Sequence, residues 1–177
     1  MILYIKFEVR HSMSLDKNYE FLDIIHDIIY HEKFKQLDLE LHHGISRYGH
    51  SMRVAKYTYK IAKFMNWDYE SITRAALLHD FFFDVQLENY GKAKTWCKHP
   101  EVAIINSKKY FELNDLQENI IVSHMFPSCK ILPKYKESWL VTCVDKCVSF
   151  YEMYRFKASL VLGIWTIFLF NMLTLQK

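Results

Sequence analysis

The chain has 177 residues, of which 51% are hydrophobic and 24% are charged, and this composition excludes a disordered or collagen-like protein. Its formal net charge of +3 is too small for the dense basic surface of a protein that binds nucleic-acid polymers, so no such partner is expected. Four glycines and three prolines make up about 4% of the chain, against about 12% in average proteins, and this shortage of turn residues predicts an all-α fold.

The beginning of the chain and its cysteines bear on location. Residues 1–18 are predicted to be an N-terminal extension, and Met13 is an alternative to Met1 as the natural start. Charged residues interrupt the opening stretch, so the apolar run of a secretory leader does not develop. The four cysteines form no CxxC pair, and the sequence therefore predicts a cytoplasmic protein without a disulfide framework.

Apolar residues at helical spacing predict a succession of helices along the chain. The expected ranges are 19–35, 49–65, 69–79, 99–111, 115–124 and 136–154, with a proline-containing loop over 126–133. Asp68 is predicted to cap the third helix, and His99-Pro100 to start the fourth, because proline is favoured in a first turn. No repeat or Gly/Ser linker divides the chain, so residues 19–158 are predicted to form one domain.

The C-terminal segment, residues 159–177, is unusually apolar. Its first seventeen residues carry no charge and lie between Lys157 and Lys177. Seventeen helical residues span about 26 Å, less than the hydrocarbon core of about 30 Å. We therefore expect an apolar helix packed on its own domain or on a second copy of the chain, as a homodimer. A membrane anchor is the less favoured alternative.

Six histidine and aspartate residues stand on apolar predicted helices or at their ends, where an ionisable side chain is costly to bury without a partner. They are His50, His79, Asp80, His99, His124 and Asp145. Imidazole and carboxylate ligands suit Fe, Mn, Co, Ni or Zn better than Mg or Ca. Any one of these residues alone is more typical of a core or an ion pair, so the metal-site hypothesis depends on the joint pattern.

The order His…His-Asp…His…His…Asp resembles the HD-domain superfamily of metal-dependent phosphohydrolases. The resemblance lies in the HSMRVA run from His50, the LLHD run that ends at Asp80 and the VDK run around Asp145. It implies a single-domain, HD-type helical bundle over roughly residues 19–155. The two further histidines resemble the subset that binds two metals, with a layout similar to HD-type diadenosine polyphosphate hydrolases.

The resemblance implies a division of the six residues between two divalent ions, with Fe or Mn favoured and Co, Ni or Zn as alternatives. The first ion would be held by His50, His79, Asp80 and Asp145. The second would be held by Asp80, His99 and His124. Asp80 would therefore bridge the two ions.

The resemblance also implies hydrolysis of a small phosphorylated compound, with a nucleotide favoured, by attack of a metal-bound hydroxide. Arg47 and Lys146 are expected to complete the catalytic set with Asp80, and to bind the substrate together with His43. Asp84 either orients a ligand histidine or caps a helix. The alternative function is a catalytically weak HD domain that senses a nucleotide, tethered to a membrane by its C-terminus.

Overall fold

A computed structural model describes residues 19–42, 45–88 and 90–174, and most of this part of the chain is helical. The predicted all-α class is therefore confirmed. Residues 19–29 are helical. The elements that follow are α2 (Glu32–Lys35), η1 (Gln36–Leu39), β1 (Leu41–His42), β2 (Ile45–Ser46), α3 (Arg47–Phe64), α4 (Tyr69–Leu78), η2 (Asp84–Leu87), α5 (Lys92–Tyr110), α6 (Asp115–Ser123) and α7 (Lys136–Thr174). The predicted extension, residues 1–18, lies outside the described residues.

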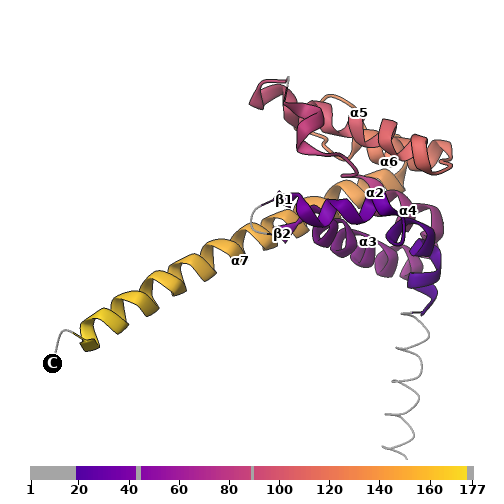
Figure 1. Ribbon diagram of the computed structural model, residues 1–177. Coiled ribbons are helices and arrows are strands. Elements are labelled where there is room, and N and C mark those ends of the chain that lie inside the picture. The colour runs from indigo at the N-terminus through magenta and orange to yellow at the C-terminus, as the bar shows by residue number, and fades with distance from the viewer. Residues whose placement is uncertain (1–18, 43–44, 89, 175–177) are drawn as a thin grey trace, which may run out of the picture.

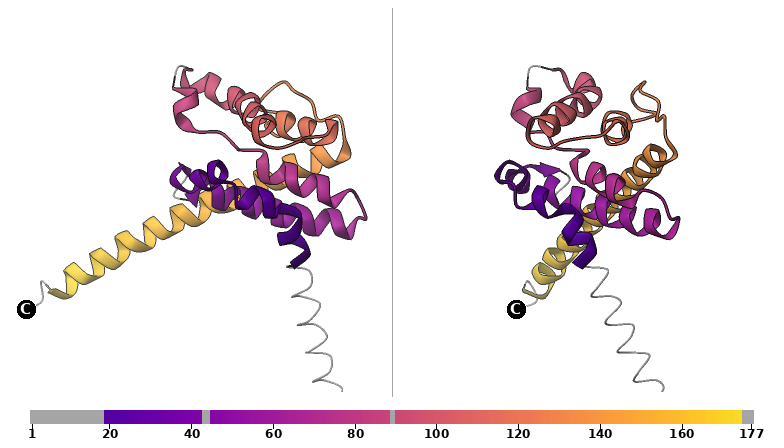
Figure 2. Two further views of the ribbon diagram at one scale, coloured as in Figure 1. Left: turned by 45° about the vertical axis from the view of Figure 1, so that its right-hand side comes forward. Right: turned by 90° about the vertical axis from the view of Figure 1, so that its right-hand side faces the viewer.

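The helices form two groups that α7 connects (Figures 1 and 2). One group contains α2, α3 and α4, and the other contains α5 and α6. Helix α4 packs on both α3 and α6, and the first part of α7 also contacts α3 and α6. A two-stranded antiparallel hairpin of β1 and β2 precedes α3, with Leu41 opposite Ser46. The contact region of α3, α4, α6 and α7 is therefore where residues distant in sequence meet.

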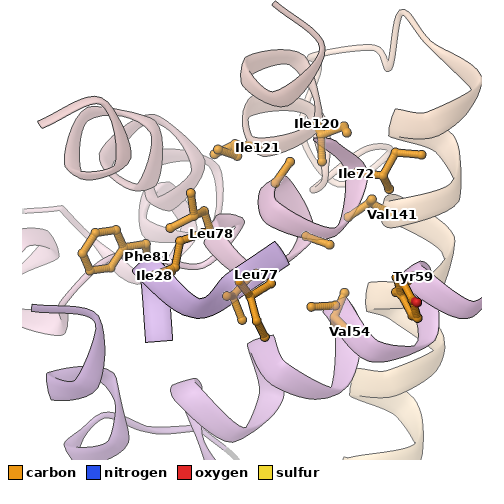
Figure 3. Close-up of a cluster of buried hydrophobic side chains, with 14 of the residues drawn as sticks. Ile28, Val54, Tyr59, Ile72, Leu77, Leu78, Phe81, Ile120, Ile121 and Val141 are labelled. Atoms are coloured by element: carbon orange, nitrogen blue, oxygen red, sulfur yellow. The ribbon is translucent and has the colours of Figure 1, made fainter. Parts of the chain in front are cut away.

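The hydrophobic core lies in this contact region (Figure 3). Helix α4 lines one side of this core, and its small residues Ala75 and Ala76 let the neighbouring helices approach closely. Leu77 and Leu78 are fully buried, and each such side chain contributes about 1.5–3 kcal/mol relative to an exposed one. This core fixes the C-terminal end of α4 against its neighbours.

Helices α3, α4 and α6 begin and end within two residues of the predicted limits. Asp68 caps α4 as predicted, and its side chain accepts a hydrogen bond from the backbone N–H of Ser71 at 3.1 Å. The single helix predicted over 19–35 is wrong, because the helix stops and restarts as α2. His31 has extended backbone angles there, and its side chain accepts from the N–H of Lys33. A local side-chain cap thus interrupts a continuous apolar pattern.

The predicted start of the fourth helix at His99 is also wrong. Helix α5 begins at Lys92, after Gly91, and continues through Pro100. A proline lacks one backbone donor but does not forbid a helix when the surrounding packing supports it. His99 consequently lies in the interior of α5 and not at its N-terminus.

Helix α7 runs without a break from Lys136 to Thr174 and extends away from the other helices (Figures 1 and 2). The predicted C-terminal helix is its last part. Leu160, Val161, Leu162 and Ile164 are exposed, so these four side chains do not pack on their own domain. No glycine or proline lies between residues 154 and 160 to turn the helix back. Contact with a second copy stays a prediction, and none of the described helices is both long and apolar enough to cross a membrane.

Candidate metal centre

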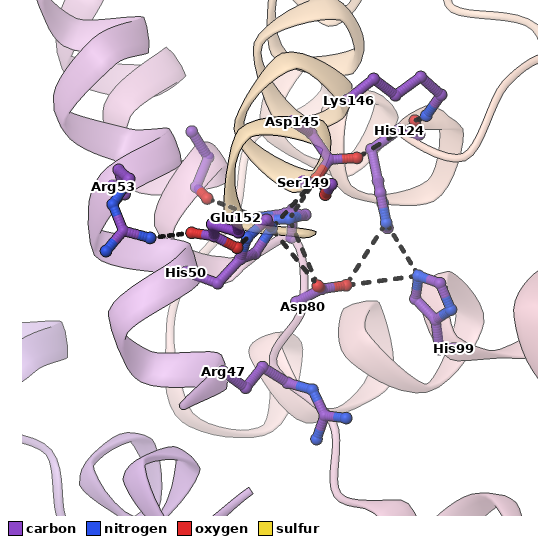
Figure 4. A network of polar contacts seen from close by, with 12 residues as sticks. Arg47, His50, Arg53, Asp80, His99, His124, Asp145, Lys146, Ser149 and Glu152 are labelled. Carbon is purple, nitrogen blue, oxygen red and sulfur yellow. Dashed lines mark hydrogen bonds and ion pairs between the residues drawn. The ribbon is translucent and has the colours of Figure 1, made fainter. Parts of the chain in front are cut away.

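All six predicted metal-type residues converge on one place (Figure 4). Three helices and the C-terminal ends of two others supply them. His50 lies on α3, His79 and Asp80 follow α4, His99 lies on α5, His124 follows α6, and Asp145 lies on α7. Residues up to 95 positions apart are thus brought within contact distance.

The first half of the cluster joins His50 and His79 to two carboxylates. His50 Nε2 lies 3.1 Å from Asp145 Oδ1 and 4.0 Å from Asp80 Oδ2. His79 Nε2 lies 3.5 Å from Asp80 Oδ2 and 3.6 Å from Asp145 Oδ1. Both imidazoles therefore present the same ring nitrogen to the same pair of carboxylates.

The second half of the cluster gathers around the other oxygen of Asp80. Asp80 Oδ1 lies 3.3 Å from His99 Nε2 and 3.5 Å from His124 Nε2. The Nε2 atoms of these two histidines are 2.9 Å apart. One carboxylate group thus faces two different pairs of histidines, with one oxygen toward each pair.

The orientation of two imidazoles comes from the helix ends that carry them. His79 Nδ1 donates to the carbonyl of Ala76 at 2.7 Å, and His124 Nδ1 donates to that of Ile121 at 2.7 Å. Each acceptor lies three residues earlier, in the last turn of its helix, where carbonyls lack an intrahelical donor. The hydrogen is held on Nδ1, and Nε2 faces the cluster.

Unsatisfied polar atoms show that the cluster fits a bound cation. His79 Nε2 and Asp80 Oδ1 are buried and have no hydrogen-bond partner among the described residues. Buried polar atoms nearly always have such a partner, and an ion between these atoms would provide one. Three overlapping groups within the cluster place three donor atoms within 4.8 Å of one another: His50–His79–Asp80, His79–His124–Asp145 and Asp80–His99–His124. A mixed imidazole and carboxylate set suits divalent transition metals.

The charges of the cluster also favour a cation. Burial raises the pKa of Asp80, but the neighbouring imidazoles of His79, His124 and His99 outweigh it and hold that pKa well below its usual value. The pKa of Asp145 is likewise lowered despite burial, by the neighbouring imidazoles of His50 and His79. Burial lowers the pKa of His99 to about 3. At neutral pH the carboxylates are ionised and His99 is neutral, as metal ligands must be.

A cavity of about 490 Å³ opens onto the cluster and is lined by both predicted phosphate-binding residues, Arg47 and Lys146. The Arg47 guanidinium is buried and lies 3.8 Å from the centre of the Phe82 ring. It donates to Glu40 at 3.2 Å, to the carbonyl of Phe82 at 3.0 Å and to Asp84 at 2.8 Å. Its other two N–H donors have no partner among the residues that the structure describes. Asp84 therefore holds Arg47 and no ligand histidine.

Lys146 lies at the edge of the cluster. Its Nζ donates to the carbonyl of His124 at 2.9 Å and lies 3.7 Å from Asp145 Oδ2. An ammonium group has three donors, so the carbonyl contact leaves donors for a ligand in the cavity. The third predicted substrate-binding residue, His43, lies outside the described residues.

Two residues beside the cluster were not predicted from the sequence: Glu152, which is buried, and Arg53, which is half-buried. Glu152 Oε2 accepts from His50 Nδ1 at 2.8 Å, and Arg53 donates to its other oxygen. The sequence spacing could have indicated Glu152, because it follows Asp145 by seven residues, or two helical turns, and so lies on the same face of α7.

A disulfide between Cys97 and Cys129 contradicts the expected absence of disulfides. The Cα atoms are 5.5 Å apart although the cysteines are 32 residues apart in sequence. The bond ties α5, two residues before His99, to the loop after α6, five residues beyond His124. Cysteine spacing alone could not show that these segments are neighbours.

Comparison with protein families gives a match to the family described as HD domain, over residues 47–148. The matched range covers more than half of the 177 residues and begins at Arg47. All six residues of the cluster lie within it. Neither the curated proteins nor the solved structures gave a match.

Proposed function

The chain belongs to the HD domain family of metal-dependent phosphohydrolases, and from that premise we propose that it hydrolyses a small phosphorylated compound, with nucleotides as the favoured substrate class. The observation that carries the proposal is the position of Asp80. Its Oδ2 faces His50 and His79, while its Oδ1 faces His99 and His124. A carboxylate with this arrangement is suited to bridge two ions.

We assign the ligands of two divalent ions, Fe or Mn by preference, with Co, Ni or Zn as alternatives. His50, His79, Asp80 and Asp145 would hold the first, and Asp80, His99 and His124 the second. Two ions at such a site lower the pKa of a coordinated water toward neutrality and stabilise charge on the leaving oxygen. The carbonyl contacts of His79 and His124 orient these ligands before any ion binds.

The cavity supports a ligand with both a charged and an apolar part. Its volume of about 490 Å³ is within the range of about 300–1,000 Å³ for small-molecule sites. Free donors of Arg47 and Lys146 would contact phosphate oxygens. Trp96, Met125, Phe150 and Met153 also line the cavity and offer apolar surface for a base. The alternative of a catalytically weak sensing module is not favoured, because all six metal-type residues are present and together.

The test is a screen of nucleotides and dinucleoside polyphosphates with the full chain, reconstituted separately with Mn²⁺ and Fe²⁺. Phosphate release and bound metal are measured on the same samples. Asp80→Asn should abolish release, whereas Asp115→Asn, an exposed change on α6, should leave it unchanged. A folded wild-type chain with stoichiometric metal that hydrolyses none of these compounds would refute the proposal.

A further inference from the structure

Glu152 is a buried carboxylate with only 4% of its surface exposed, on the face of α7 that carries Asp145. Figure 4 shows it between Arg53 and His50, both of α3. One oxygen accepts from His50 Nδ1 at 2.8 Å, and the other accepts from the Arg53 guanidinium. Both oxygens are therefore occupied by donors from a single helix.

The contact decides which nitrogen of His50 carries hydrogen. An ionised carboxylate only accepts, so His50 Nδ1 must donate, and as a metal ligand the ring would present the lone pair of Nε2. That nitrogen is the one 3.1 Å from Asp145. His79 and His124 obtain the same arrangement from helix-end carbonyls. His50 lies inside α3, where carbonyls already accept from the helix, so it needs an acceptor from elsewhere.

We propose that Glu152 is a positioning residue that holds the His50 imidazole in the tautomer and orientation required for metal binding, and that Arg53 fixes Glu152 in turn. The inference rests on the proposed metal-dependent function of the same site. Groups that hydrogen-bond to a ligand histidine typically change metal affinity about 10–100-fold.

Replacing Glu152 by glutamine should change the His50 tautomer in a specific way. Glutamine has one oxygen and one NH₂ group, whereas His50 and Arg53 both require an acceptor. If the oxygen serves Arg53, the NH₂ group faces His50 Nδ1, and the hydrogen of His50 moves to Nε2. Removing Arg53 frees the oxygen for His50, so a second substitution should repair the first.

The test compares the full-length wild-type chain with Glu152→Gln, with Arg53→Ala/Glu152→Gln, and with Glu137→Gln as a matched change on the same helix. Mn²⁺ affinity is measured by competition titration. The His50 tautomer is measured in metal-free protein by long-range ¹H–¹⁵N NMR. Glu152→Gln should weaken Mn²⁺ binding about 10–100-fold and move the hydrogen to Nε2. The double variant should recover affinity and tautomer, and Glu137→Gln should match wild type.

Wild-type Mn²⁺ affinity in Glu152→Gln would overturn the proposal. So would weaker binding with an unaltered His50 tautomer, because that result indicates lost packing, and so would a double variant that recovers neither property. Neither readout uses turnover. A chain that binds Mn²⁺ yet hydrolyses nothing would refute the proposed function and leave the result for Glu152 standing.

Discussion

The disulfide between Cys97 and Cys129 allows a quantitative prediction about stability. Replacing both cysteines by serine opens a loop of 32 residues in the unfolded chain. The loop-closure entropy for that length corresponds to about 3.7 kcal/mol at 25 °C. We expect the double variant to lose roughly this much free energy of unfolding, or about 7–15 °C in Tm for a domain of this size.

Urea unfolding followed by circular dichroism measures this difference. Cys143→Ser/Cys147→Ser is the matched control, because these two cysteines are free and exposed on α7. A reductant should lower the stability of wild type and of the control to that of the Cys97/Cys129 variant. It should leave that variant unchanged. Thiol titration of the denatured, unreduced wild-type chain should find two free thiols.

A Cys97/Cys129 variant as stable as wild type would contradict the stabilising role of the bond, and four thiols that react without reductant would contradict the bond itself. Mn²⁺ binding at the candidate metal centre gives a second measurement of the effect of this disulfide. Because the bond joins the segments that carry His99 and His124, its removal should weaken Mn²⁺ binding to the half of the cluster around Asp80 Oδ1. Equal Mn²⁺ stoichiometry and affinity in oxidised wild type and variant would show that the segments are held by packing alone.

Three further substitutions test the site, an ion pair and the core. Asp80→Ala removes the carboxylate shared by both halves of the cluster, so bound metal and nearly all turnover should be lost. Bound metal is measured by mass spectrometry, and wild-type metal content would contradict the proposed bridge. Hydrogen bonds from Arg74 lower the pKa of Asp27, so its stabilisation is present above about pH 3.9 and is lost as pH falls through the lower folded value. In urea unfolding, Asp27→Asn should lower the free energy of unfolding by about 0.5 kcal/mol at pH 7, a small loss because the carboxylate is half exposed. Near pH 2 it should lower it by nothing. An equal loss at both pH values would contradict the ion pair with Arg74. Phe81 is fully buried, and Phe81→Ala should cost about 3–5 kcal/mol by the same assay; a cost below about 1 kcal/mol would contradict its place in the core.

The limits of a helix were predictable where a single apolar stripe in the sequence determines them. Helix α4 is the clearest case, with Asp68 as its cap and a buried face that ends at Leu78. Prediction failed where a local signal competed with packing. Pro100 favours a helix start, yet α5 extends beyond it in both directions, and His31 interrupts a stripe that continues on either side. Neither outcome is contained in the periodicity of the sequence.

The meeting of the six residues was predictable because the histidines stand at recognisable places in the sequence. His79 and His124 each follow an apolar helix by one residue, and each donates Nδ1 to a carbonyl in the last helical turn. A helix end thus supplies the orientation that a ligand imidazole needs, and the residue after it is free to leave the helical path. Asp80 uses that freedom to turn its carboxylate between the two histidine pairs.

His50 shows what such motifs leave out. Because it lies inside α3, its orienting acceptor comes from α7, 102 residues away, and no local pattern around His50 names it. The acceptor can be found only from the other side, by asking which residue shares the helical face of Asp145. A histidine at a helix end carries its own acceptor in the preceding turn. A histidine within a helix requires a partner from another element, and in this chain that partner is Glu152.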